Sequence, residues 1–117
     1  MTLINVKKSD NLSLVCKAAD NAVHAYLNGN EVYTKQGVGE RGFNDERPLT
    51  EAMQDGYNVL TVLGVKWGEN TLYDVTVELN GVVIGSHVEL QQPAGSQPRG
   101  IVWDFALEFD LADDARP

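Results

Sequence analysis

Apolar and polar residues alternate along most of this chain. Alternation with a period of two places one set of side chains on each face of a β-strand. The last stretch, residues 101–111, is the clearest case, because its acidic residues Asp104, Glu108 and Asp110 all fall on the face opposite the apolar ones. Other strand-like stretches are residues 12–17, 22–27, 31–35, 57–63, 72–79 and 82–90. The helical period of 3.6 is nearly absent, so the pattern predicts an all-β protein.

Two asparagine-glycine pairs mark tight turns between these stretches. Asn28-Gly29 separates residues 22–27 from 31–35, and Asn80-Gly81 separates 72–79 from 82–90. Type I′ turns need positive φ at both central residues, which asparagine and glycine tolerate, so both pairs predict β-hairpins. Residues 48–53 are too short for an independent helix and predict either a single helical turn or an outer strand.

About eight strands with frequent turns are typical of a β-sandwich. One-sided alternation indicates antiparallel sheets that are covered on one face. Two such sheets stacked face to face bury the apolar face of every strand. We therefore expect an antiparallel two-sheet β-sandwich. Residues 1–111 form this single domain, and residues 112–117 form a charged tail.

Charge narrows the choice of partners. Nine basic and 17 acidic residues among 117 give a net charge of −8, which repels phosphate and so argues against nucleic acid and anionic membranes. No segment approaches the roughly 20 apolar residues of a membrane helix, and the N-terminus lacks the apolar core of a signal peptide. These features predict a cytoplasmic location, with leaderless export or excision from a longer chain as the open alternatives.

The sequence contains no recognisable catalytic motif. Cys16 is the only cysteine and alternates with leucines, which predicts a buried thiol rather than a nucleophile or metal ligand. No serine lies in a nucleophile elbow. His24 and His87 fall on separate predicted strands, and His24 points away from its apolar neighbours. We therefore expect no catalytic residues, no metal and no cofactor.

One part of the chain resembles a known family. The strand ending in Asn28-Gly29, the later Gly42-Phe43, the Leu49-Thr50 pair, and the run in which Gly56, Asn58, Leu60 and Val62 alternate follow one another in order. This order, from Val23 to Val62, resembles the galactose-binding-domain-like jelly-roll sandwiches that serve as sugar-binding domains of glycoside hydrolases. The resemblance implies a sugar-binding accessory domain without catalytic residues, in which Asn58 bonds nearby backbone and Phe43 packs in the framework.

Three polar loops offer groups that could bind a sugar, namely residues 35–47, 64–70 and 91–99. Sugar binding requires an aromatic ring for stacking and planar polar groups for the hydroxyls. Trp67 lies between Lys66 and Gly68, so it is either an exposed ring or a lid on one end of the sandwich, whereas the alternation around Trp103 places that ring in the core. The candidate ligand-binding residues are Arg41, Asn44, Asp45, Arg47, Trp67, Asn70 and Gln97.

These observations favour a non-catalytic, lectin-like module with a carbohydrate ligand. The alternative is a structural or assembly subunit that forms a homo-oligomer through sheet faces or edges, because Val15, Tyr26 and Tyr33 are predicted to point outward and exposed apolar groups often mark interfaces. A small enzyme is the third hypothesis, and it requires carboxylates or a histidine to converge in a pocket.

Overall fold

A computed structural model describes residues 2–37, 43–68, 71–92 and 99–114, with only the backbone described for residues 90–92. It shows nine strands and one short 3₁₀ turn. The elements are β1 (Leu3–Lys7), β2 (Leu12–Asp20), β3 (Ala22–Leu27), β4 (Asn30–Gln36), β5 (Asp45–Pro48), η1 (Thr50–Ala52), β6 (Gly56–Lys66), β7 (Thr71–Leu79), β8 (Val82–Gln92) and β9 (Gly100–Ala112).

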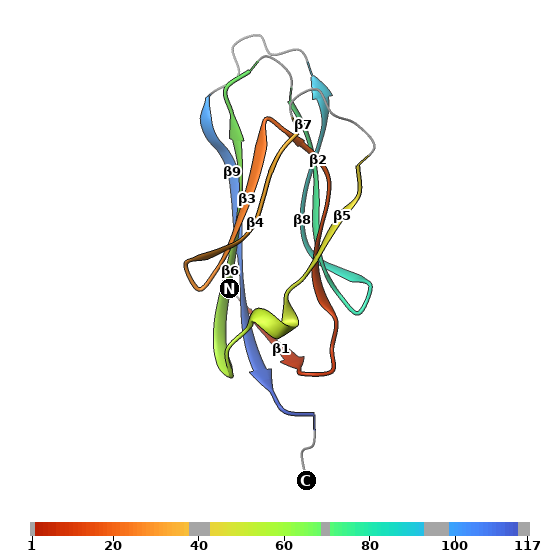
Figure 1. The fold of residues 1–117 in the computed structure, drawn as a ribbon, viewed down its shortest axis with the longest axis vertical. Coiled ribbons are helices and arrows are strands. Elements are labelled where there is room, and N and C mark those ends of the chain that lie inside the picture. The colour runs from red at the N-terminus through yellow and green to blue at the C-terminus, as the bar shows by residue number, and fades with distance from the viewer. Residues whose placement is uncertain (1, 38–42, 69–70, 93–98, 115–117) are drawn as a thin grey trace.

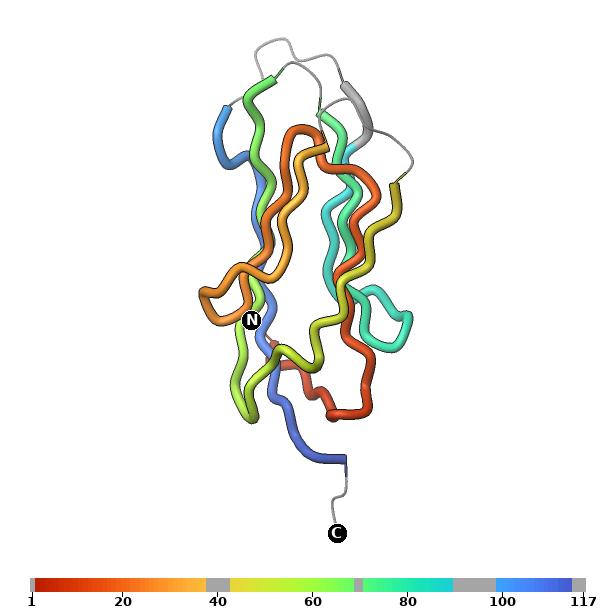
Figure 2. The backbone as a smooth tube through the Cα atoms, in the orientation of Figure 1, coloured from red at the N-terminus to blue at the C-terminus, as the bar shows by residue number. Residues whose placement is uncertain are grey.

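The strands form two sheets that pack face to face, which confirms the predicted β-sandwich (Figure 1). One sheet has five strands in the order β1-β9-β6-β3-β4, and the other has four in the order β5-β2-β7-β8. Neighbouring strands are antiparallel except β1 and β9, which run parallel. The backbone trace in Figure 2 shows the two layers, with the β3–β4 and β7–β8 turns projecting to opposite sides.

Both predicted hairpins are present. Asn28 and Gly29 have φ of 53° and 82°, and Asn80 and Gly81 have φ of 51° and 82°. Positive φ at both central positions is the type I′ geometry that these residue pairs predict.

The alternating residues build one core between the sheets. Tyr73, Val75 and Val77 of β7 have no exposed surface, and Cys16 of β2 is also fully buried, as the sequence predicts. Trp103 is 9% exposed, which confirms its assignment to the core. Its indole lies against Gly64 of β6, where a Cβ would fall far inside van der Waals contact of the indole Nε1.

Two strands were not predicted, and one predicted element is a turn. β1 has a single buried residue, Val6, and forms a strand because it pairs with the end of β9. β5 has the polar sequence DERP and forms a strand by pairing with β2. Residues 48–53 adopt the single-turn alternative, as η1. In each case pairing partners outweigh the local pattern of hydrophobic residues.

The outward orientation predicted for Tyr33 is wrong. Tyr33 pairs with the buried Ala25 across β3 and β4, so its ring turns toward the interior and packs against the core. Its hydroxyl donates to Asp45 Oδ2 at 2.7 Å, which links the two outer strands β4 and β5.

Within the described residues, no helix is long and apolar enough to cross a membrane.

Asn58 and Phe43 take the framework positions expected from the sequence. The buried amide of Asn58 accepts from the Gln54 N–H at 2.9 Å and donates to the carbonyls of Gln54 and Gly56 at 2.8 and 2.9 Å. Phe43 is partly buried against the core, with Lys35 Nζ 4.7 Å from its ring centroid. These contacts fix how the chain crosses from one sheet to the other.

Candidate functional site

The described flanks of the three candidate loops meet at one end of the sandwich. Gly37, after β4, donates its N–H to the carbonyl of Asn21 at 3.0 Å. Trp67, after β6, donates its N–H to the Asn21 side chain, and the Arg99 guanidinium, before β9, donates to the Trp67 carbonyl. We call this region, defined by Asn21, Gly37, Trp67 and Arg99, the loop end.

Asn21 is the centre of the loop end. It lies in the corner between β2 and β3 and is only 2% exposed. Its Oδ1 accepts from the N–H groups of Trp67 at 2.6 Å and Gly68 at 2.7 Å, while its Nδ2 donates to Asp20 Oδ1 at 3.0 Å. A Cβ at Gly68 would lie 2.9 Å from Asn21 Nδ2, so glycine lets the loop approach this closely. The chain after β6 is therefore fixed by a buried amide.

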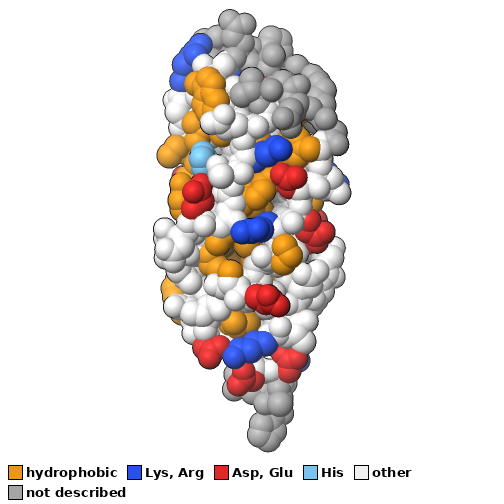
Figure 3. All heavy atoms as spheres, in the orientation of Figure 1, with side chains coloured by type: hydrophobic (Ala, Val, Ile, Leu, Met, Phe, Trp, Pro, Cys, Tyr) orange, Lys and Arg blue, Asp and Glu red, His pale blue; other side chains and the backbone are white. Residues whose placement is uncertain are grey.

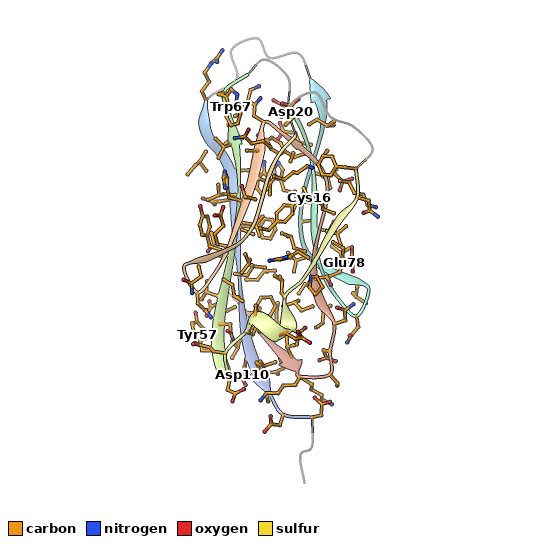
Figure 4. All side chains as sticks on the ribbon, in the orientation of Figure 1. Cys16, Asp20, Tyr57, Trp67, Glu78 and Asp110 are labelled. Atoms are coloured by element: carbon orange, nitrogen blue, oxygen red, sulfur yellow. The ribbon has the colours of Figure 1, made fainter. Side chains whose placement is uncertain are left out.

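Trp67 itself is exposed to solvent. Its side chain lies at the surface near the loop end (Figure 4), and the residue is 44% exposed. A lid that folds back over the sandwich would be largely buried, so this exposure favours the binding interpretation over the lid. The bonds to Asn21 and Arg99 hold the backbone of Trp67 at its N–H and at its carbonyl, so the side chain projects from a fixed point of the backbone.

Buried polar groups lie just beneath this surface. Lys66 is 2% exposed, and its Nζ donates to the Gly68 carbonyl at 3.0 Å. Thr71 is 1% exposed, and its Oγ1 finds no hydrogen-bond partner among the described residues. A buried hydroxyl without a partner is unfavourable, and such groups often occur near functional sites.

Arg47 lies elsewhere, in a shallow, open cleft between the outer strands β4 and β5, and Asp45 lies beside it. We call it the side cleft; it has a volume of about 330 Å³ and is lined by Glu31, Val32, Tyr33, Thr34 and Arg47. Asp45 bonds the Tyr33 hydroxyl, and Arg47 Nε donates to the Val32 carbonyl at 3.0 Å. These bonds join the two sheets along one side of the sandwich.

The environment next to the side cleft shifts two pKa values. The pKa of the Cys16 thiol is raised to about 11, mainly because the thiol is buried. Burial also raises the pKa of Tyr33, with the hydrogen bond to Asp45 as the second cause. Both groups stay protonated at neutral pH, so neither provides a nucleophile or a base there.

The structure brings only part of the predicted site together. Trp67 lies at the loop end, Asp45 and Arg47 line or adjoin the side cleft, and Asn44 is exposed just before β5. The predictions for Arg41, Asn70 and Gln97 fall outside the described residues. The described contacts of Asp45 and Arg47 are with β4, whereas those of Trp67 are with Asn21 and Arg99.

Sequence reasoning missed Asn21. Asp20-Asn21 interrupts two alternating stretches, which signals a corner, yet nothing local shows that the Asn21 amide binds a loop more than 40 residues later.

Among the described residues, no group of three or more His, Cys, Asp or Glu side chains is arranged to hold a metal ion. Figure 3 shows charges of both signs interspersed with apolar patches on the face in view.

Comparison with known proteins gives no match for this chain, whether among family models, curated proteins or solved structures.

Proposed function

We propose that this protein is a non-catalytic β-sandwich module that binds carbohydrate at the loop end, with Trp67 as the stacking group. The observation that carries the proposal is Trp67, 44% exposed, on a backbone fixed by the buried Asn21. A backbone held in place loses little conformational freedom on binding, which is the usual advantage of a preorganised site.

The polar groups at the loop end complement the ring. The apolar face of a sugar stacks on an indole, while its hydroxyls need planar donors and acceptors nearby. Arg99 contacts Trp67 through one donor, and a guanidinium has five, so others remain for a ligand. Asp45 and Arg47 take no part in this proposal, because their bonds hold the two sheets together.

Intrinsic fluorescence can test the proposal directly. The chain has two tryptophans, and Trp103 is in the core, so a ligand at the loop end changes the emission of Trp67 alone. The protein is titrated with glucose, galactose, mannose, N-acetylglucosamine and short oligosaccharides of each. We expect at least one of them to change the emission, and calorimetry to give a dissociation constant for it.

Two variants locate the binding site. Trp67→Ala should weaken sugar binding by about tenfold or more, because the stacking surface is removed. Tyr57→Ala is the matched control, since Tyr57 is also an exposed aromatic, at 53%, and lies far from Trp67 (Figure 4). The proposal fails if no sugar binds, or if Tyr57→Ala weakens binding as much as Trp67→Ala does.

A further inference from the structure

β8 is an outer strand with features that favour pairing. It ends the four-stranded sheet and is 11 residues long. Natural proteins usually protect such edges with short length, proline, lysine, β-bulges or inward-pointing charges, because unpaired backbone groups attract another strand. The irregular pairing of β8 with β7 lies on either side of residues 85–89, which pair regularly. Residues 82–92 contain neither proline nor lysine, and β8 exposes Val82, Val83 and Val88 by 65%, 53% and 56%.

The other outer strands are protected. β5 has four residues, three of them charged and the fourth a proline. β1 has only five residues. β4 carries Glu31 and Lys35, and it is tied to β5 by the bond between Tyr33 and Asp45. Of the outer strands, only β8 combines length with exposed valines.

The side chains of β8 have a pattern that suits pairing with itself. Between two irregularities, Gly85 to Glu89 pair regularly with β7. His87 and Glu89 lie opposite the buried Val75 and Tyr73, so both face the sandwich interior. Their side chains are 30% and 28% exposed, and Nε2 of His87 lies 3.0 Å from Oε1 of Glu89.

We propose that β8 pairs antiparallel with β8 of a second copy of this chain, about a two-fold axis through Val88. In this register His87 lies opposite the partner subunit's Glu89, and Val88 lies opposite the partner subunit's Val88. Imidazole–carboxylate and β-branched pairs across strands are stabilising.

Neighbouring registers are less favourable. An axis one residue earlier places His87 opposite the partner's His87, and an axis one residue later places Glu89 opposite the partner's Glu89. Two carboxylates directly opposite each other repel, and two imidazoles opposite each other forgo the pairing with a carboxylate. The imidazole–carboxylate pairs therefore favour the register about Val88.

The pairing also joins the two sandwiches into one larger assembly. The four-stranded sheets of the two copies become a continuous eight-stranded sheet, with the same surface used by both, as in other two-fold dimers. Phe105 and Leu107 of β9 are partly buried, and both lie beside Gly85 on this side of the sandwich. A second copy paired at β8 would therefore shield apolar side chains of both sheets from solvent.

Sedimentation of the full chain over a range of concentrations tests the association. We expect a dimer for the wild type and an increase in its dissociation constant of about tenfold or more for Val88→Lys, which places two ammonium groups opposite each other. Val82→Lys is the matched control. It makes the same change at a more exposed valine, but this register pairs residues 84–92, so Val82 lies beyond it and the dimer should persist.

Cysteine cross-linking tests the register. Val88→Cys places a thiol opposite itself, so mild oxidation should give a covalent dimer. Ser86→Cys lies on the same face, but its two copies are four residues apart along the strand, roughly 13 Å, and should not cross-link. Cys16 is buried in both variants and does not compete.

Several outcomes would overturn this proposal. They are a wild-type chain that is monomeric at all concentrations, a dimer that survives Val88→Lys, and cross-linking of Ser86→Cys in preference to Val88→Cys. Circular dichroism of each variant confirms that the sandwich is folded. Sugar binding at the loop end does not enter this test, so each proposal can fail without the other.

Discussion

One oxygen atom holds the loop that presents Trp67. Oδ1 of Asn21 accepts two backbone N–H groups at 2.6 and 2.7 Å in a site that is 2% exposed. Removing this acceptor leaves both donors without a partner, which costs far more than an average hydrogen bond contributes. The geometry of the proposed binding surface therefore depends on a residue that need not touch a ligand.

We predict that Asn21→Ala lowers the free energy of unfolding by about 3 kcal/mol, because two backbone donors lose their acceptor. Urea denaturation measures this change, and the fluorescence anisotropy of Trp67 should fall as the loop loosens. Asn30→Ala, at the exposed first position of β4, is the control and should change stability by less than about 0.5 kcal/mol. An equal effect of the two substitutions would contradict the role given to Asn21.

Buried acids make the stability sensitive to alkaline pH. Burial raises the pKa of Cys16 from its ordinary 9.0 to about 11 and that of Tyr73 from 10.0 to about 12. The unfolded chain releases these protons at lower pH than the folded chain does. Stability is therefore fully present below about pH 9 and is lost as the pH rises through the folded pKa values.

We predict that the Cys16 thiol alone lowers the free energy of unfolding by about 2 kcal/mol between pH 8 and pH 10.5, given two units of pKa difference. Urea denaturation at the two pH values measures the loss. In Cys16→Ala the decrease in the free energy of unfolding between pH 8 and pH 10.5 should be smaller by about 2 kcal/mol. This difference does not depend on how much stability the substitution itself removes at pH 8. A pH dependence that is identical in the two proteins would rule out the thiol as its cause.

At the scale of the strands, a glycine opposite a tryptophan sets the packing between β6 and β9. The Trp103 indole lies on the backbone of Gly64, with Tyr73 edge-on at 5.3 Å and His87 stacked at 4.3 Å between ring centroids. The ring is enclosed by these neighbours, so it has little room to move aside.

We predict that Gly64→Ala lowers the free energy of unfolding by about 3 kcal/mol, because the new methyl group overlaps the indole. Thermal denaturation measures the loss, and the emission of Trp103 should shift to longer wavelength. Gly85→Ala is the matched control. Its Cβ would lie 2.9 Å from the Cδ1 end of Leu107, which can rotate away, so the cost should stay near 1 kcal/mol. The packing argument fails if the two substitutions cost the same.

Local sequence patterns predict the elements well where each strand carries its own signal. Two kinds of signal act within a few residues and can be recognised in the sequence alone. They are the alternation in β7 and β9 and the positive-φ pairs Asn28-Gly29 and Asn80-Gly81. β5 could not be predicted, because its three charged residues and one proline form a strand only beside β2. The orientation of Tyr33 depends in the same way on its pairing with β3.

At the scale of the whole molecule, the candidate site depends on contacts between distant parts of the chain. The sequence indicates three polar loops and leaves Trp67 open between an exposed ring and a lid, whereas in the structure Asn21 joins two of these loops and bonds Trp67 across 46 residues. Asp45 and Arg47 also look like loop residues in the sequence, yet pairing of β5 with β2 places them beside β4. Loop composition alone cannot distinguish a residue that presents a surface from one that joins the sheets.

The direction of β8 has a consequence for how a paired molecule would engage its targets. β8 runs toward the loop end, since its last residue, Gln92, pairs with Thr71 just after the loop that carries Trp67 (Figure 1). Antiparallel pairing of two such strands turns the two indoles to opposite poles of the assembly. If both proposals hold, a dimer of this kind would not bind one glycan-coated surface with both sites and would gain no avidity there. It would instead connect two separate surfaces.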